Sequence, residues 1–480
     1  MGMFPDDEEG EEIDDKFAEN VLQKAINAYS YVDVDDIADA YNWFMANDRH
    51  DDALVVLDYG LSIHAGNCKL LLIRAMVLID NSELAKAEML LDYVADDASG
   101  DPNYHISRGW LALKKGDDKL AEKHFDEAVK VAADDMIDNT AGEIGSNLVQ
   151  FEKFGMSIKY FAMLQDSYLR SIPQTAFEYA YALSFVGQDD RAMKLYEQIT
   201  DGDPFYDSAW YNLGIIYSKK GLLDKAIEAY TNCTDANTEY AEAYFNLGNI
   251  YLEMDDILGA VDCYTSYLSL SQPAPEMRVY AYLGDCWLRL GNVDLAERIL
   301  DYVVKNIDDC DSAWYDLGRC HLERGLNTQA AQEFRRAIDL NPCVACYHFA
   351  MAQASLNVAD LPMAIHSMED GLRCAPDDVL AWFELIRMSF DFSNCDSEKF
   401  NNFLNKKKRE FGEPKALLLV EAYVEFFVFN KKRAATSLMR DVAKCMPQII
   451  MDAAVEPNLS KLFEQKGIVR VLDEFNIKLK

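Results

Sequence analysis

Apolar and small residues recur along this chain at helical spacing. In the segment that starts at Asp207, such residues lie at i, i+3, i+4 and i+7, so they share one face of a helix. They are Trp210, Leu213, Gly214 and Tyr217. After a short stretch around Gly221, Ala226 and Tyr230 begin a second stripe of the same kind. The pattern predicts two helices joined by a tight turn, and no stretch of alternating β-branched residues predicts a strand.

This pair of stripes returns about every 34 residues. In each unit the two helices cross closely at position 8 of the first helix and position 20 of the second helix. The pairs, in chain order, are Tyr41 with Ala53, Ala75 with Ala87, Gly109 with Ala121, Ser146 with Ile158, Ala180 with Ala192, Gly214 with Ala226, Gly248 with Ala260, Gly284 with Ala296, Gly318 with Ala330, and Ala352 with Ala364. The predicted units are 34–67, 68–101, 102–135, 139–172, 173–206, 207–240, 241–274, 277–310, 311–344 and 345–378, with one more at 416–449.

Two units carry the pattern most completely. The unit 207–240 has the two stripes given above, and the unit 311–344 repeats them with Trp314, Leu317, Gly318, His321, Ala330, Phe334, Ala337 and Pro342. This pattern resembles the tetratricopeptide repeat. The resemblance implies an all-α fold, a right-handed superhelical α-solenoid of stacked helix–turn–helix hairpins that bury apolar surface against their neighbours. It also implies a scaffold that binds other proteins and is not an enzyme.

The pattern is weak at both ends and at two internal places. Residues 1–33 are expected to form an acidic, disordered leader followed by an N-terminal capping helix. The unit 139–172 has Gly142 where Trp or Tyr is usual. Residues 379–480 comprise a degenerate repeat that loses the pattern after Trp382, one further unit, and a C-terminal helical cap. At the two internal places we expect the superhelix to bend or to be interrupted.

The chain is strongly acidic, and its charge is uneven. The formal net charge is −36, and residues 6–15 contain eight acidic residues and no basic one. Residues 401–480 carry 15 Lys and Arg against 10 Asp and Glu, a net of +5 that leaves −41 on the first 400 residues. The acidic leader is interpreted either as a solubilising tail or as a tail that docks on a basic partner. The overall charge disfavours a nucleic-acid partner, because phosphates require a basic surface.

Two basic clusters lie in the C-terminal part, at 406–409 and at 431–433. They are interpreted as a solvated helix face, as a contact with an anionic partner, or as a contact with the acidic body of the protein itself. An alternative function follows from them. The protein is then a regulatory or assembly cofactor that acts through this basic segment, and the repeats are a spacer.

The sequence lacks the marks of a secreted or membrane protein. No basic start precedes an apolar segment at the N-terminus. The most apolar stretch, 416–429, carries Glu421 and Glu425 and is too short to span a bilayer, so we expect no membrane insertion. Eleven cysteines without a regular spacing predict a reducing, cytoplasmic location.

Known catalytic and cofactor motifs are also missing. The chain has no Gly-rich phosphate loop, no HExxH zinc motif and no GxSxG nucleophile elbow. Residues 379–480, where the repeat pattern is lost, contain no histidine, and nothing there selects a pair of carboxylates for acid–base chemistry. We therefore predict no enzyme, no catalytic residue and no cofactor.

One short string looks like a metal site. Cys343 and Cys346 are two residues apart, His348 follows, and Cys320 and Cys374 lie in adjacent units. A structural zinc ion needs four converging ligands, and no second pair has zinc spacing. Cysteine also packs as a small apolar residue, so we predict packing and no bound metal.

The resemblance places a partner in the concave groove, which is lined by positions 2, 5, 9, 12 and 13 of each first helix. Aromatic rings and amides at or beside these positions suit a peptide or a helix laid along the groove. The candidate binding residues are Phe177, Tyr181, Tyr211, Asn212, Phe245, Asn246, Asn249, Tyr315, Arg319 and Phe349. An alternative remains open for position 5, where an aromatic ring also packs against the neighbouring repeat.

A clamp for a C-terminal carboxylate, known from co-chaperones of this family, is not expected. Such a clamp needs Lys, Asn and Arg at fixed places on consecutive units. Tyr211, Ile215 and Tyr282 stand at those places instead. The leading hypothesis is therefore a cytoplasmic scaffold that binds internal peptide or helical segments of protein partners.

Overall fold

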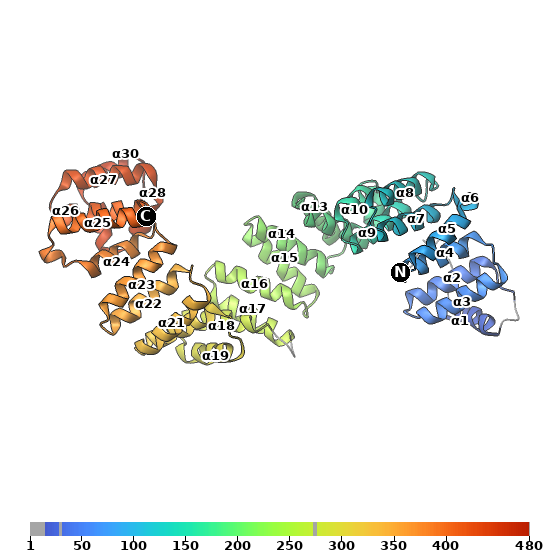
Figure 1. The fold of residues 1–480 in the computed structure, drawn as a ribbon, viewed down its shortest axis with the longest axis horizontal. Helices are drawn as coiled ribbons and strands as arrows, with labels where there is room; N and C mark the ends of the chain where they lie inside the picture. Colours follow the sequence, from blue (N-terminus) through green and yellow to red (C-terminus); the bar gives the residue numbers. More distant parts are fainter. Residues whose placement is uncertain (1–14, 28–30, 272–275, 480) are drawn as a thin grey trace. The chain divides into compact units, whose positions relative to one another are not determined.

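The structure is a computed structural model, and it describes residues 15–27, 31–271 and 276–479. Within these ranges the chain is made of helices joined by short turns and has no strand. The chain divides into two compact units at residues 238 and 239, and each unit is described by itself (Figure 1). All but the last residue of the predicted acidic run at 6–15 lies outside the described residues.

The first unit contains helices α1 to α15 (Figure 1). Their bounds are α1 Asp15–Asn27, α2 Val34–Ala46, α3 His50–Ile63, α4 Cys68–Asp80, α5 Leu84–Tyr93, α6 Ala95–Ala98, α7 Pro102–Lys114, α8 Asp118–Val131, α9 Ile137–Gln150, α10 Phe154–Phe161, α11 Asp166–Ser171, α12 Pro173–Phe185, α13 Asp189–Gly202, α14 Asp207–Lys219 and α15 Leu223–Ala236. Consecutive helices pair into hairpins, and α1 packs on the first of them through Ala18, Val21 and Leu22.

The second unit contains α16 to α30 and one short 3₁₀ turn. The bounds are α16 Ala241–Glu253, α17 Ile257–Leu270, α18 Met277–Arg289, α19 Val293–Asn306, α20 Asp311–Glu323, α21 Asn327–Leu340, α22 Ala345–Asn357, α23 Leu361–Cys374, α24 Val379–Ser389, the 3₁₀ turn Phe392–Asn394, α25 Ser397–Phe411, α26 Lys415–Phe427, α27 Lys432–Cys445, α28 Pro447–Ala453, α29 Pro457–Phe463 and α30 Lys466–Glu474. Here too, stacked hairpins form an all-α solenoid.

Several hairpins close where a glycine of the first helix meets a ring from the second helix. A Cβ atom placed on Gly214 would lie 2.5 Å from the ring of Tyr230, and one on Gly318 would lie 2.6 Å from the ring of Phe334. Both rings are almost completely buried. Because these distances are shorter than any contact a real Cβ makes, the glycine allows the two helices to approach each other. The glycine and its ring are 16 residues apart in both hairpins.

This rule corrects the register of one predicted unit. In the hairpin of α9 and α10, the small residue that faces the second helix is Gly145, and a Cβ there would lie 2.6 Å from the ring of Phe161. The sequence analysis placed Ser146 at this position, one residue too late. The correct pair again has a separation of 16 residues, and Phe161 is fully buried.

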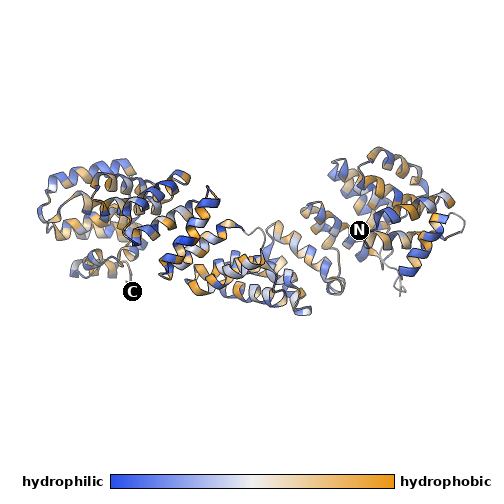
Figure 2. Cartoon of the chain, turned by 90° about the horizontal axis from the view of Figure 1, so that it is seen from below, coloured by the Kyte–Doolittle hydropathy of each residue, from blue (hydrophilic) through white to orange (hydrophobic). Residues whose placement is uncertain are grey.

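The C-terminal part keeps a helical core although the repeat pattern is lost after Trp382. Trp382 is fully buried and packs edge-on against Phe411 at the end of α25, with ring centroids 5.0 Å apart. Helices α24 to α30 share this apolar core. Many helices of the chain show hydrophobic residues on one side and hydrophilic residues on the other, the pattern expected when one face packs on a neighbour (Figure 2).

Candidate functional site

The candidate binding residues of the first unit lie on the first helices of two hairpins. Phe177 on α12 is half-buried, and its ring centroid is 5.6 Å from that of Tyr196 and 5.5 Å from that of Tyr206. Tyr211 on α14 is half-buried 5.8 Å from Tyr230. Both position-5 rings therefore pack against rings of their own hairpin or its neighbouring turn while keeping an accessible part.

The other two candidates of this unit, Tyr181 and Asn212, make different contacts. Tyr181 is 40% exposed and meets Phe154 of the preceding hairpin edge-on, at 5.8 Å between centroids. The amide of Asn212 donates from Nδ2 to the backbone oxygen of Ser208, at 2.7 Å, within its own helix. This bond uses one of the two donor hydrogens that an Asn amide offers to a peptide.

In the second unit, the Phe245 ring stands in a group of tyrosines. Its centroid is 6.2 Å from Tyr264, 5.5 Å from Tyr267 and 6.2 Å from Tyr282. Tyr282 in turn stacks on Tyr264 at 5.8 Å and is 39% exposed. The accessible parts of Phe245, Tyr267 and Tyr282 form an aromatic surface on α16, α17 and α18, and the buried Tyr264 supports it from below.

Two asparagines lie beside this surface. Asn246 is half-buried on α16. Asn249 accepts a hydrogen bond at Oδ1 from the hydroxyl of Tyr264, at 2.8 Å. The hydroxyl of this buried tyrosine is thereby satisfied, and Asn249 has a structural task in addition to any role in binding.

Tyr315 and Phe349 continue the series of position-5 rings. Tyr315 lies 5.8 Å from Phe334 and 4.8 Å from Tyr347, measured between ring centroids. Phe349 is half-buried, and its ring lies over Gly371 of α23. As in the first unit, one side of each ring supports the hairpin, so the packing alternative for position 5 describes part of its role.

Arg319 is held by two carboxylates. Its Nη1 lies 2.9 Å from Oδ1 of Asp285 and 2.8 Å from Oδ1 of Asp316, and its guanidinium is 5.6 Å from the centroid of Tyr315. Burial, together with the nearby charge of Asp285, raises the pKa of Asp316 to about 7. The charge of Arg319 is therefore largely used within the chain.

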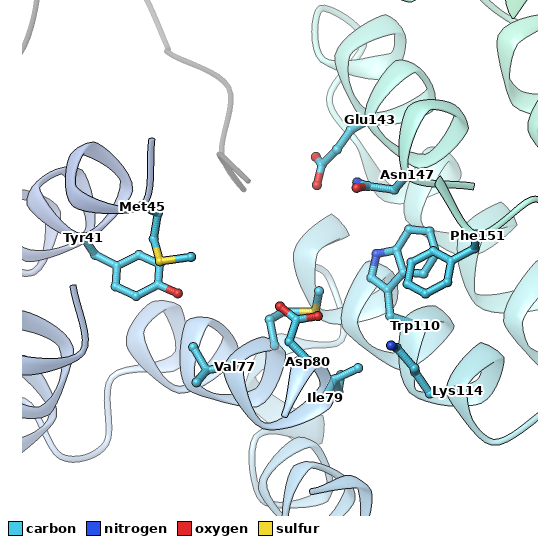
Figure 3. A pocket seen from close by; sticks show the side chains of 11 residues that line it. Tyr41, Met45, Val77, Ile79, Asp80, Trp110, Lys114, Glu143, Asn147 and Phe151 are labelled. Atoms are coloured by element: carbon cyan, nitrogen blue, oxygen red, sulfur yellow. The ribbon is translucent and has the colours of Figure 1, made fainter. Parts of the chain in front are cut away.

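The sequence analysis missed a pocket on the first helices of the first four hairpins. We call it the Glu143 pocket, and Figure 3 shows its lining. The space inside is a cavity of about 60 Å³. It is lined by Tyr41, Met45, Met76, Val77, Ile79, Asp80, Trp110, Lys114, Glu143, Asn147 and Phe151. Several of these residues occupy positions 9, 12 and 13 of units 34–67, 68–101 and 102–135, which is the signal that would have found them.

The Glu143 pocket has an apolar floor and a charged rim. Trp110 is 4% exposed and Ile79 is 1% exposed, so the floor is almost completely covered. Asp80, Lys114 and Glu143 form the rim, and Figure 3 shows both carboxylates directed into the same open space. Desolvation by the surrounding wall raises the pKa of Glu143 to about 8, and burial also raises the pKa of Asp80.

Some lysines of the C-terminal basic clusters pair with carboxylates of the same chain, while Arg409, Lys432 and Arg433 are exposed. Lys407 is buried between Glu369 and Glu410, with Nζ to oxygen distances of 2.7 and 2.6 Å. Lys408 lies 2.6 Å from Glu421, and Lys431 lies 3.2 Å from Glu425.

The string around Cys343 shows no metal geometry. Cys343, Cys346 and Cys374 are exposed, and Cys320 is buried. In the part of the chain that the structure describes, no group of three or more His, Cys, Asp or Glu side chains is arranged to hold a metal ion. None of the helices in the described ranges is long and apolar enough to cross a membrane.

The repeats match a known family. Family models for the tetratricopeptide repeat match residues 207–240, 241–273 and 288–342. No curated protein sequence matches the chain.

Among solved structures, the fold is similar to three helical repeat proteins. One is YrrB, described as a TPR protein with an unusual peptide-binding site (18% identity, TM-score 0.33, covering 39% of this chain and 95% of that chain). Another is MamA from Desulfovibrio magneticus RS-1 (17% identity, TM-score 0.33, covering 37% and 97%). A third is PilW, a type IV pilus biogenesis factor (19% identity, TM-score 0.36, covering 42% and 92%). At these identities the likeness concerns the fold alone.

Proposed function

Since the chain is a tetratricopeptide repeat protein and thus a scaffold for protein interactions, we propose that it binds peptide or helical segments of partner proteins on its first-helix faces and catalyses no reaction. The binding residues of this proposal are those named above, from Phe177 to Phe349. Its partners are proteins, and nucleic acid is not among them.

The aromatic surface of the second unit carries this proposal. Phe245 and Tyr282 are each fixed on one side by Tyr264, while Tyr282 keeps 39% of its surface exposed. Rings that are already held by packing lose little conformational freedom when a partner covers them. Such rings contribute strongly to binding energy at protein interfaces. A peptide laid on this surface would gain apolar contact at a small entropic cost.

The test compares capture of partners by three forms of the full chain. Phe245→Ala combined with Tyr282→Ala is expected to reduce capture from a lysate of the source cell at least about tenfold, since interface aromatics each contribute about 1 kcal/mol or more. Phe205→Ala is the matched control, because Phe205 is 77% exposed in a turn of the other unit. Capture by the double variant at the level of the control would contradict the proposal. A loss of far-UV circular dichroism would show that the two rings act only as core.

The alternative function through the basic C-terminal segment has less support. Lys407 and Lys408 are largely covered and pair with carboxylates of the same chain, which leaves Arg409, Lys432 and Arg433 as exposed cations of the clusters. The location in the proposal is the cytoplasm, supported by eleven free cysteine thiols, which a reducing compartment preserves.

A further inference from the structure

We propose that the Glu143 pocket binds a basic side chain, lysine or arginine, presented by a protein partner. The aliphatic stem lies on the apolar floor of Trp110, Met76 and Ile79, and the cationic head lies between the carboxylates of Asp80 and Glu143. This site belongs to the first unit and is separate from the aromatic surface around Phe245. It rests on the proposed function only in that the basic side chain comes from a bound protein.

The shape of the pocket suits a long, amphipathic side chain. Its floor combines Trp110, Met76 and Ile79, each less than a tenth exposed, and its cavity measures about 60 Å³. Lysine and arginine carry three or four methylene groups that cover apolar surface while the charge stays at the rim. Trp110 stacks on Phe151 with ring centroids 5.3 Å apart, which fixes this part of the apolar lining.

Glu143 is the acidic group of the pocket that a guest cation could ionise and pair with. Desolvation is the one cause that raises the pKa of Glu143, so no hydrogen bond or charge of the described chain compensates its carboxylate. Two nearby arginines of the unit form ion pairs with other carboxylates, Arg74 with Asp58 and Arg108 with Asp92.

Lys114 is the one cation on the rim. Its Nζ lies 4.9 Å from the ring centroid of Phe151, and its charge acts on Asp80. It therefore leaves Glu143 without a cationic partner in the described chain. A guest cation would pair with Glu143 directly and with Asp80 across the opening, and it would restore to both carboxylates the stabilisation lost by desolvation.

The occupancy of the pocket has a defined dependence on pH. The groups that face Glu143 are Asp80 on α4, Lys114 on α7, Tyr41 on α2 and Tyr168 on α11. With its pKa near 8, the Glu143 carboxyl holds a proton at neutral pH in the empty pocket. A cation binds better to the carboxylate, so binding displaces this proton. Affinity for the cation is therefore expected to rise as the pH increases from 6 to 9.

The test uses small probes on the full chain, with saturation-transfer NMR as the readout. The probes are N-acetyl-arginine amide, N-acetyl-lysine amide, the uncharged isostere N-acetyl-citrulline amide, and N-acetyl-norleucine amide. We expect saturable binding of at least one cationic probe and at least about fivefold weaker binding of the two neutral ones, the effect of a charged hydrogen bond. The two cationic arms show whether the head is a guanidinium or an ammonium.

Variants of the rim locate the binding. Glu143→Gln and Asp80→Asn are each expected to weaken the cationic probe at least about fivefold, since each removes one charged partner. Glu253→Gln, an exposed carboxylate at the end of α16, removes the same charge and should leave binding unchanged.

Three results would overturn the proposal: no binding of either cation, equal binding of citrulline and arginine probes, or binding insensitive to both rim variants. Because no partner protein is present, failure here leaves the capture test of Phe245 and Tyr282 unaffected.

Discussion

The guanidinium of Arg319 on α20 donates a hydrogen bond to Asp285 on α18, with Nη1 2.9 Å from Oδ1. The two residues are 34 positions apart and occupy the same place in consecutive repeats. Stacking brings equivalent positions of neighbouring hairpins together, so an acid and a base at that position become partners. Arg319 also satisfies the buried Asp316.

Removal of Arg319 is therefore expected to destabilise the second unit. Arg319→Ala leaves two carboxylates close together, one of them buried, and should cost about 1–2 kcal/mol after allowance for the partial exposure of the pair. The urea midpoint of the full chain measures this loss. Arg335→Ala removes the same charge from an exposed position and should have little effect. Equal midpoints for the two variants would show that the ion pair contributes nothing.

A second prediction concerns the glycines under the buried rings. Gly318→Ala places a Cβ atom 2.6 Å from the ring of Phe334, so the hairpin must open, at a cost of about 1–3 kcal/mol. Gly155→Ala is the control, because a Cβ on this helical residue meets nothing within 4 Å and alanine favours helix. Thermal unfolding should show a lower melting temperature for the first variant alone.

A third prediction concerns the turn between the two helices of a hairpin. Gly221 adopts φ of 69°, and Asp255 at the equivalent place adopts φ of 61°. Side chains are disfavoured in this left-handed region, so Asp255→Gly is expected to stabilise the protein by about 0.5 kcal/mol. The reverse change, Gly221→Asp, should lower the melting temperature. A destabilised Asp255→Gly variant would refute this explanation.

The fourth prediction follows from the raised pKa of Glu143. Its carboxyl has a pKa of about 8 in the folded chain and an ordinary value of 4.5, so the folded state binds the extra proton between these limits. Stability from this group is complete at pH 4 and is lost as the pH rises toward 9. Glu143→Gln lacks the titration. Its melting temperature should equal that of the wild type near pH 5 and exceed it near pH 9.

The hairpins were predictable because their signal is local and repeated. A small residue and a large apolar one, 16 residues apart, recur in most hairpins, as for Gly214 and Tyr230. The prediction is wrong at the hairpin of α9 and α10, where the repeat period points to Ser146 and the structure has Gly145. The residue opposite Phe161 must lack a Cβ atom, because the two helices are too close there for a side chain. This steric requirement decides the register, and the average repeat length does not.

The site was less predictable, because a position in a repeat does not show what occupies the neighbouring one. The sequence offers Arg319 as a binding residue but does not show that its guanidinium also pairs with Asp285 and Asp316. The Glu143 pocket depends on four hairpins and on the desolvation of one carboxylate, which no local pattern encodes. The sequence indicates the pocket only through large apolar residues at positions 9 and 12 of the early repeats, such as Trp110 and Met45.

Hydrogen exchange of the full chain, with and without a partner purified by capture, tests the scaffold function most directly. A bound partner should slow amide exchange in the first helices of the second unit, α16, α18 and α20. Exchange in the second helices, α17, α19 and α21, should stay at the level of the free chain. Protection confined to α25 and α27, which carry the basic clusters, would contradict the scaffold function and would support the alternative function.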